Sequence, residues 1–214
     1  MTVIAIDGPA ASGKSSVSLR LARRLGFAYV NSGSMYRAVT WEVLRQGAET
    51  ASPESVGEAL ARAEISCGIG EDNESFIRMN GEVLSSVLRD SEINRHVSPV
   101  SAVPAVRERI STALRELAHG RPLVMEGRDI GTAVFPETPF KFYLDASPEI
   151  RQKRREAEGG ADQIAARDQM DSSRKAAPLQ IAPGASVVDT SLLTLDGVVD
   201  EILRLLHPLG IVPK

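Results

Sequence analysis

The residues best suited to chemistry form a glycine-rich run near the N-terminus. Gly8-Pro9-Ala10-Ala11-Ser12-Gly13-Lys14-Ser15 fits the pattern G-x-x-x-x-G-K-[ST] without a mismatch, directly after the apolar run Val3–Asp7 and before a stretch with helical leucine spacing. Backbone N–H groups of such a loop converge on phosphate oxygens, and the dipole of the following helix favours negative charge. The Lys14 amine can reach the β- and γ-phosphates, and the Ser15 hydroxyl can bind Mg²⁺. The run therefore predicts a site for a nucleoside triphosphate.

This loop alone does not identify a reaction. The chain contains no Asn-Lys pair, so it lacks the Asn-Lys-x-Asp signature by which GTPases usually recognise guanine. Asp145 ends an apolar run, as an acid at the metal site of a motor or transporter ATPase does. The Ser147-Pro148 pair that follows is also typical of a strand that leads into a capped helix, and this is the interpretation that we favour.

Three further clusters could bind a second anionic substrate. Residues 31–37 follow the second expected strand and residues 127–131 follow the third, at the strand ends where ligands bind in doubly wound folds. Arg167, Asp171 and Arg174 are four and three residues apart, so a helix would carry all three on one face. That face could hold a phosphate and a sugar hydroxyl, or it could be an ordinary exposed face with salt bridges.

Composition places the chain among folded globular proteins. Of its 214 residues, 43% are hydrophobic and 25% are charged, which excludes wholesale disorder. The formal net charge of −3 argues against binding to long nucleic acids, although most of the basic residues are arginine, which binds phosphate well. Cys67 is the single cysteine, so a disulfide framework and a cysteine zinc cluster are excluded. No apolar run approaches the ~20 residues of a membrane helix, and we expect a cytoplasmic protein.

Strand-like and helix-like segments alternate along the chain and predict an α/β fold with a doubly wound parallel sheet of about five strands, flanked by helices. The expected strands are 3–7, 28–30, 123–126, 140–145 and 186–189, and the expected helices are 14–25, 34–46, 53–63, 92–103, 104–118, 148–158, 161–175 and 195–206. The pattern changes at residues 64–88, where two short strands, 65–69 and 76–79, and the turn signal Asn80-Gly81 predict an inserted antiparallel meander.

Taken together, these motifs resemble those of the bacterial cytidylate (CMP/dCMP) kinases, and the match runs in order from about residue 3 to residue 206. The most specific segment is Gly127-Arg128-Asp129-Ile130-Gly131-Thr132. The others are Ile4-Ala5-Ile6-Asp7-Gly8-Pro9 with the phosphate loop, Ser32-Gly33-Ser34-Met35-Tyr36-Arg37, Val97-Ser98, Pro104-Ala105-Val106-Arg107, Arg167-Asp168, Asp171-Ser172-Ser173-Arg174 and Ala177-Pro178-Leu179. The resemblance implies one P-loop kinase domain over residues 1–214, with a subdomain for the nucleoside monophosphate (NMP) at about 32–118, including the meander, and a short lid at 151–175.

The resemblance also implies an activity, the transfer of the γ-phosphoryl group of ATP to CMP or dCMP in the presence of Mg²⁺. It implies catalytic roles for Lys14, Arg128 and Arg174, and a metal ligand at Ser15. The ATP contacts that it implies are Gly8, Pro9, Ala10, Ala11, Ser12, Gly13, Lys14, Ser15, Ser16 and Arg155.

For the acceptor nucleotide, the resemblance implies three groups of contacts. Arg37, Arg128 and Arg174 would hold its phosphate, Asp171 with Arg167 nearby would hold its sugar, and Ser98, Arg107 and Asp129 would meet the cytosine, with Ser32 and Tyr36 also among the substrate-binding residues. A carboxylate can accept a hydrogen bond from the N4 amine of cytosine, whereas the carbonyl of uracil would be repelled.

Two departures from the family pattern accompany this resemblance. Asn31 stands where many relatives have Asp, and residues 151–167 are short and lack the lysine found in some relatives. Gly159-Gly160 lies between two helical segments and is a candidate hinge of the lid.

Two other functions remain open from the residues alone. One is a kinase for another acceptor, such as UMP, AMP or a small metabolite, and the other is a nucleotide-binding sensor without an acceptor. We expect a monomer whose partners are small nucleotides, with no nucleic acid polymer and no membrane.

Overall fold

The computed structural model describes residues 1–84, 88, 90–157, 164–174 and 176–213, with the backbone alone at Arg167. The chain divides into two compact units, Met1–Val30 with Ala118–Lys214, here named the sheet unit, and Asn31–Leu117, here named the inserted unit. Within the described part of the chain, none of the helices has the length and apolar character needed to cross a membrane.

The sheet unit is built on a five-stranded parallel sheet with the strand order β2-β6-β1-β7-β8, which confirms the predicted fold class. Its strands are β1 (Val3–Asp7), β2 (Ala28–Asn31), β6 (Leu123–Gly127), β7 (Lys141–Asp145) and β8 (Ser186–Asp189). All five residues of β1 are buried, as expected for a central strand that is covered on both faces. The phosphate loop leaves the end of this strand.

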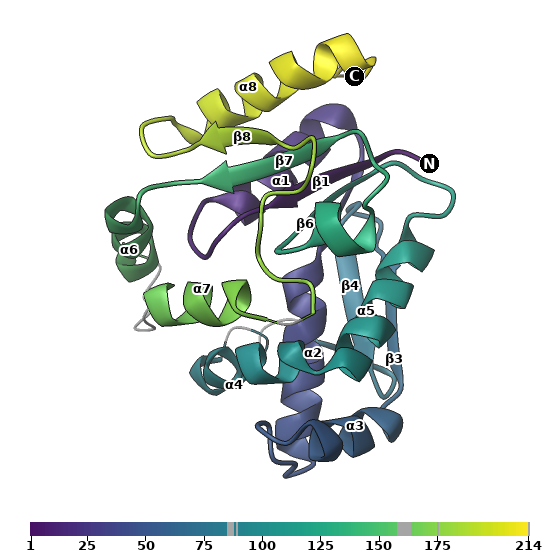
Figure 1. Ribbon diagram of the computed structural model, residues 1–214. Helices are drawn as coiled ribbons and strands as arrows, with labels where there is room; N and C mark the ends of the chain where they lie inside the picture. The colour runs from purple at the N-terminus through teal and green to yellow at the C-terminus, as the bar shows by residue number, and fades with distance from the viewer. Residues whose placement is uncertain (85–87, 89, 158–163, 175, 214) are drawn as a thin grey trace. The chain divides into compact units, whose positions relative to one another are not determined.

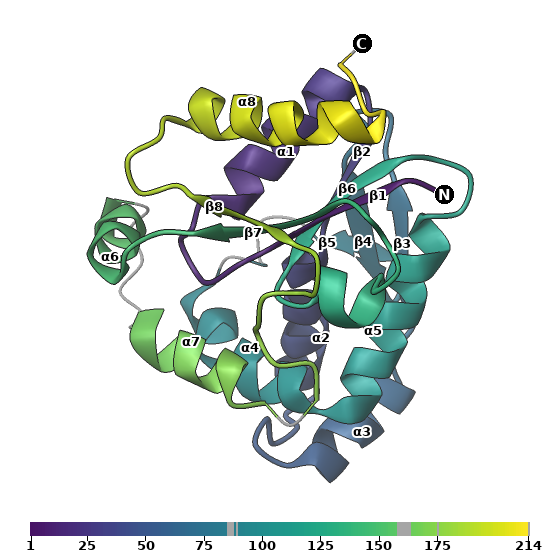
Figure 2. The same ribbon diagram turned by 45° about the horizontal axis from the view of Figure 1, so that its top comes forward.

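Helices α1 (Lys14–Leu25) and α8 (Leu195–Leu206) cover the same face of this sheet (Figures 1 and 2). Leu21 of α1 and Ile202 of α8 are fully buried in one apolar cluster with Ile4 and Leu144 of the strands. The remaining helical elements of this unit are α6 (Pro148–Ala157), α7 (Ile164–Ser172), the π-helical turn η2 (Ile130–Val134) and the 3-10 turn η3 (His207–Leu209).

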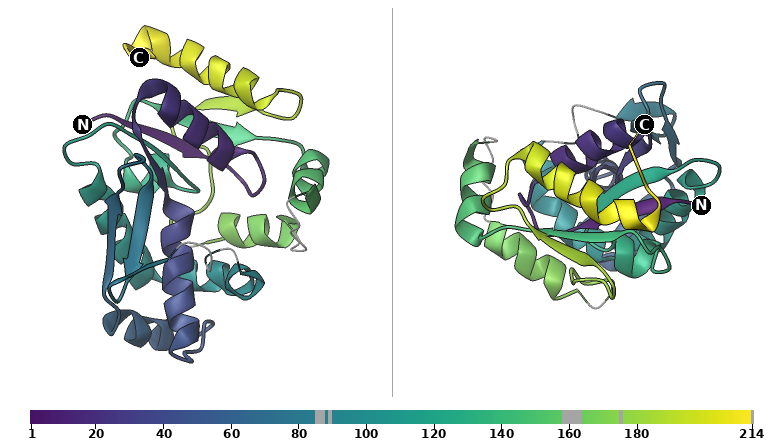
Figure 3. Two further views of the ribbon diagram at one scale, coloured as in Figure 1. Left: turned by 180° about the vertical axis from the view of Figure 1, so that it is seen from behind. Right: turned by 90° about the horizontal axis from the view of Figure 1, so that it is seen from above.

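Within its described residues, the inserted unit contains a small antiparallel sheet and four helices, seen from behind on the left of Figure 3. Its strands are β3 (Ile65–Ile69), β4 (Ser75–Met79) and β5 (Glu82–Leu84), and its helices are α2 (Ser32–Arg45), α3 (Pro53–Ala61), α4 (Ser91–Ala102) and α5 (Pro104–Leu117). Asn80 and Gly81 both have positive φ, 51° and 84°, as a tight hairpin turn requires. The third strand follows this turn and extends the two that the sequence predicts.

Three local features differ from the sequence-based prediction. Helix α7 ends at Ser172 rather than near residue 175, because the chain turns back and the N–H of Leu179 bonds to the Asp171 carbonyl at 2.9 Å. Helix α2 begins at Ser32 rather than at residue 34, since the Asn31 side chain accepts the N–H of Ser34 and caps the helix. The turn η2 lies in a segment for which the sequence predicts neither a helix nor a strand.

Candidate functional site

The phosphate loop is held tightly against the sheet. Gly8 approaches the neighbouring strand so closely that a Cβ there would lie 2.1 Å from the Leu144 carbonyl oxygen, so no other residue fits. Lys14 is buried, and its Nζ donates to the Pro9 carbonyl at 2.6 Å and to Ser12 Oγ at 3.4 Å. The amine therefore lies over its own loop, at the place where phosphate is expected.

Two arginines of α6 connect the loop to other elements of the sheet unit. Arg151 donates to the Ala10 carbonyl at 3.2 Å and forms an ion pair with Asp168 of α7, which itself accepts the Ala10 N–H at 3.1 Å. Arg154 donates to Thr190 Oγ1 at 2.9 Å, and this hydroxyl donates to the Ser12 carbonyl at 3.0 Å. The loop thus contacts both helices expected to form the lid.

No motif predicts these two contacts, although one sequence signal could have found them. Arg154 and Arg155 follow Arg151 by three and four residues, which puts both on the same face of α6 as Arg151. Arg155, the ATP contact that the resemblance implies, is partly buried on that helix, and its role stays a prediction.

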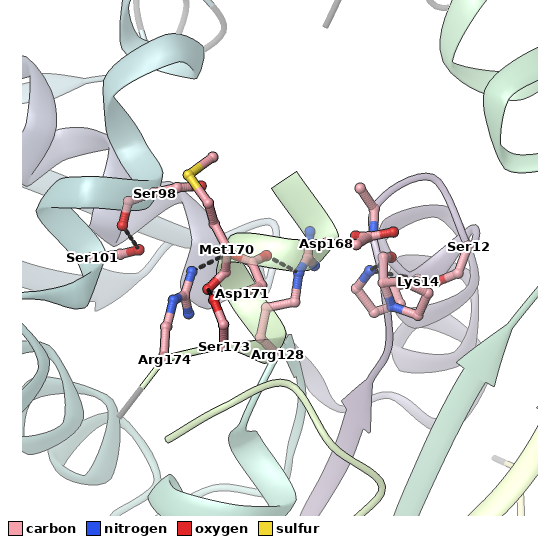
Figure 4. A network of polar contacts seen from close by, with 12 residues as sticks. Ser12, Lys14, Ser98, Ser101, Arg128, Asp168, Met170, Asp171, Ser173 and Arg174 are labelled. Carbon is pink, nitrogen blue, oxygen red and sulfur yellow. Dashed lines mark hydrogen bonds and ion pairs between the residues drawn. The ribbon is translucent and has the colours of Figure 1, made fainter. Parts of the chain in front are cut away.

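A second cluster joins two of the predicted acceptor arginines through one buried carboxylate. Asp171 Oδ2 accepts from Arg128 Nε at 2.9 Å, and Asp171 Oδ1 forms an ion pair with Arg174 (Figure 4). The side chain of Asp171 is 3% exposed, so both guanidinium groups are held against a carboxylate that water hardly reaches. Because Arg128 contacts Asp171 through Nε, this ion pair does not use the fork formed by its two Nη atoms. Such a fork suits a phosphate group.

Asp129 follows Arg128 and begins the turn η2. It is buried, and its side chain makes no capping hydrogen bond to this turn. The backbone before and after it is held by Asp7, which pairs with Gly127 in the sheet and accepts the N–H of Ile130. The backbone at Asp129 is therefore well defined.

In the inserted unit, the structure brings together three residues for which the resemblance implies acceptor contacts. The guanidinium of Arg107 lies 5.4 Å from the centroid of the Tyr36 ring and donates to the Ser101 carbonyl at 3.1 Å. Ser101 Oγ in turn donates to the carbonyl of Ser98 at 3.0 Å. Arg107 is only 6% exposed, which is unusual for an arginine and limits the positions that it can take.

The first turn of α2 carries the two other predicted residues of this unit. Ser32 is buried at the start of the helix, which Asn31 caps. Arg37 lies close to this turn, since a Cβ at Gly33 would come within 3.0 Å of Arg37 Nη1 and 3.1 Å of Asn31 Oδ1. A glycine at position 33 thus makes room for the Arg37 guanidinium, and the amide of Asn31 serves as a helix cap.

Comparison with known proteins agrees with these features. The model of the cytidylate kinase family matches residues 4–208. A curated protein named cytidylate kinase from Mycolicibacterium paratuberculosis is 45% identical to this chain, and the alignment covers 96% of this chain and 95% of the relative. One of the same name from Nocardia farcinica is 44% identical, and its alignment covers 94% of this chain and 92% of the relative. The chain belongs to the cytidylate kinase family.

Among solved structures, a gluconokinase from Sinorhizobium meliloti aligns with this kinase at a TM-score of 0.50 and 15% sequence identity, over 98% of this chain and 93% of the other. At this identity, the likeness concerns the fold alone. Family membership in turn confirms the resemblance drawn from the motifs, and with it a phosphotransferase that uses nucleotides.

The remaining predicted residues are placed as follows. Ser15 and Ser16 are exposed on the first turn of α1. Arg167 belongs to α7, but its side chain lies outside the described part of the chain, as does the candidate hinge Gly159-Gly160. Asp145 accepts the N–H of Ala146 at 2.8 Å while Ser147 Oγ accepts that of Ile150 at 3.3 Å, the geometry of a strand exit and a helix cap.

Nothing in the described residues forms a protein cage for a metal ion, since no three His, Cys, Asp or Glu side chains are grouped as ligands would be. The chain does fit Mg²⁺ bound to a nucleotide. Such an ion takes few protein ligands and is held largely by phosphate oxygens and water. The exposed hydroxyl of Ser15, next to the buried Lys14, is the ligand type that this arrangement needs.

Proposed function

We propose that this kinase transfers the γ-phosphoryl group of ATP to CMP or dCMP, giving CDP or dCDP and ADP. The main support for a phosphate-bearing acceptor is the cluster of Arg128, Asp171 and Arg174, which lies in the same unit as the phosphate loop. A protein that only senses or hydrolyses ATP has no use for a second phosphate clamp. The 44–45% identity to cytidylate kinases over nearly the whole chain favours a cytidine nucleotide as the acceptor.

On the donor side, the loop from Gly8 to Ser15 with Ser16 binds the phosphates of ATP, and Arg155 adds a contact from α6. Lys14 places a positive charge at the β- and γ-phosphates, where charge develops during transfer. Ser15 holds Mg²⁺, which when bound neutralises charge on the same phosphates. The lysine is already buried beside its loop, so little reorganisation is needed when ATP binds.

On the acceptor side, Arg37, Arg128 and Arg174 bind the phosphate of CMP. Asp171, already bonded to two of these arginines, orients them and accepts a hydrogen bond from a hydroxyl of the sugar. Arg167 is assigned to the sugar as well, as the resemblance implies. The preorganised guanidinium forks hold the attacking oxygen in position. Phosphoryl transfer depends on such positioning and on charge neutralisation, and needs no covalent intermediate.

The base is recognised by Asp129 together with Ser98 and Arg107, and Ser32 and Tyr36 complete the substrate contacts. Asp129 accepts from the N4 amine, while Ser98 and Arg107 donate to the O2 and N3 acceptors of cytosine. We further propose a cytoplasmic monomer that binds nucleotides and neither nucleic acid polymers nor membranes.

The acceptor can be tested directly with a panel of nucleotides. ADP formation would be measured in a coupled assay with ATP and CMP, dCMP, UMP, AMP or GMP. We expect clear turnover with CMP and dCMP and far lower kcat/KM with the other three. A preference for UMP or AMP would favour the other-acceptor hypothesis, and ADP release that is independent of the acceptor would favour a sensor or hydrolase.

The role of Asp129 leads to a prediction for base choice. The Asp129→Asn substitution keeps the size of the side chain but replaces one oxygen with an amide donor, which can bond to the carbonyl of uracil. Because one good base contact is worth about 1–3 kcal/mol of discrimination, we expect the CMP to UMP ratio of kcat/KM to fall by about tenfold or more. Asp196→Asn, at an exposed carboxylate paired with Arg20, is the control. An unchanged ratio would remove Asp129 from base recognition.

The contacts between the loop and the two lid helices lead to a prediction for dynamics. Hydrogen exchange would be measured over residues 151–175 without ligand, with a non-hydrolysable ATP analogue, with CMP and with both. We expect the strongest protection with both ligands, since Arg151 and Asp168 meet the donor loop and Asp171 holds the acceptor arginines. Helix α8 serves as the internal control. Equal protection of residues 151–175 in all four states would contradict a closing lid.

A further inference from the structure

Asp7 is a buried carboxylate at the end of β1 whose two oxygens have separate partners in a distant part of the chain. Its Oδ1 accepts the N–H of Ile130 at 2.8 Å, and its Oδ2 accepts the N–H of Gly131 at 2.7 Å. The residue is only 3% exposed. Two bonds to successive N–H groups fix both the position and the direction of the turn η2 relative to β1.

The turn that Asp7 holds begins directly after Arg128 and Asp129. An aspartate in the position of Asp129, just before a helical turn, usually caps that turn with its own side chain. Here Asp129 has φ −151° and ψ 24° and forms no such bond. Asp7 caps the turn from another strand, so the side chain of Asp129 is not needed for this structural task.

The fit between Asp7 and the turn is close. A Cβ at Gly131 would lie 3.3 Å from each of Asp7 Oδ2, the Cγ of Lys141 and the Cβ of Ala182. Burial, with repulsion by nearby Asp129, raises the pKa of Asp7 to about 6, although the two backbone bonds and nearby Lys14 favour the ionised form. Keeping a buried carboxylate charged is unfavourable for folding, and such groups are commonly retained at functional sites.

We propose that Asp7 is a positioning residue for acceptor binding, because its carboxylate holds the backbone that presents Arg128 and Asp129. The same residue directly precedes Gly8, which is held against the Leu144 carbonyl. Asp7 therefore links the start of the phosphate loop to the turn η2, and both lie in the sheet unit. The inference rests on the proposed function, which gives Arg128 and Asp129 their acceptor roles.

The test is the Asp7→Asn substitution. An amide of the same shape can accept only one of the two N–H groups and presents its own N–H₂ to the other, which disturbs the turn but not the strand. Since a hydrogen bond to a charged group is stronger than one between neutral groups, we expect the KM for CMP to rise by about tenfold or more. We also expect the CMP to UMP ratio of kcat/KM to fall by about fivefold, with kcat and the Kd of an ATP analogue changing by about twofold at most.

Two further variants make the result decisive. Asp189→Asn changes another strand-end aspartate of the same sheet, whose carboxylate accepts the N–H of Ser191 at 2.8 Å, and it should behave as the unmodified protein. Gly131→Ala leaves Asp7 intact and pushes the turn away from its Oδ2, so it should raise the KM for CMP and lower the base ratio in the same way. If the Asp7 variant does not fold, the Gly131 variant decides the question.

The inference is overturned if a folded Asp7→Asn variant keeps the KM for CMP and the base ratio of the unmodified kinase. It is also overturned if the affinities for CMP and for the ATP analogue fall equally, since that pattern indicates a general structural role. The activity of the unmodified kinase distinguishes failure of the proposed role of Asp7 from failure of the proposed function. If that protein shows no CMP-dependent ADP formation, the function itself is wrong, whatever the variants do.

Discussion

Replacing Lys14 with alanine should lower kcat for CMP phosphorylation by about 10²–10³-fold, the usual effect of losing one preorganised charge at the transferring group. The KM for CMP should change by about twofold at most, because Lys14 belongs to the donor loop and serves the charge that develops during transfer. The amine is buried and bonded to the Pro9 carbonyl at 2.6 Å, so it is already in place before substrate binds. Initial rates at saturating ATP with varied CMP would separate kcat from KM.

The matched control for this experiment is Lys153→Ala, which removes a lysine from an exposed position on α6. Thermal unfolding of both variants would show that the fold is retained. A Lys14→Ala enzyme with nearly normal turnover would exclude this lysine from the mechanism, and with it the assignment of the donor loop.

Replacing Arg128 with glutamine should act mainly on the acceptor. We expect kcat/KM for CMP to fall by about 10²-fold or more, since a bidentate, charge-assisted contact to phosphate is lost, with most of the effect in KM. The affinity for an ATP analogue should stay within about twofold, because Arg128 has no role in the donor loop. Asp171 keeps its ion pair with Arg174, so the buried carboxylate is not left without a cation. Steady-state kinetics and binding of the analogue would together measure both effects.

Arg204→Gln is the control for this substitution. Like Arg128, Arg204 pairs with a carboxylate, but on the exposed face of α8, where its Nε and Nη2 donate to Glu201 at 2.8 and 2.7 Å. It should leave the kinetics unchanged. If Arg128→Gln weakened binding of the ATP analogue as much as binding of CMP, then the acceptor role of Arg128 would be wrong.

Local sequence patterns were sufficient to predict the sheet and the donor loop. Val3–Asp7 begins with four apolar residues, three of them β-branched, and the structure places it as the buried central strand of the predicted parallel sheet. The donor loop was predictable because Gly8, Gly13 and Lys14 all lie within one short run of the sequence. The meander was predictable for a similar reason, since Asn80-Gly81 marks its turn, although β5 has only three residues and is too short to show a strand pattern.

The parts that sequence patterns could not predict depend on contacts between distant residues. The spacing of Asp171 and Arg174 predicts their pairing, but Arg128 is 43 positions from Asp171, and only the folded chain brings them together. The turn η2 depends on Asp7, 123 positions before Ile130. Helix α7 ends early because Leu179 returns to Asp171. Contacts between residues so far apart produce no periodic pattern in the sequence.

Transfer of a phosphoryl group from ATP to CMP can be measured by following the γ-phosphate itself. ATP labelled at the γ-phosphate would be incubated with Mg²⁺ and the purified kinase, with and without CMP, and the labelled products would be separated. We expect the label to appear in the β-phosphate of CDP, in equal amount to the ADP formed, and very little of it to reach inorganic phosphate. Label that appears in inorganic phosphate at the same rate with and without CMP would contradict transfer to CMP.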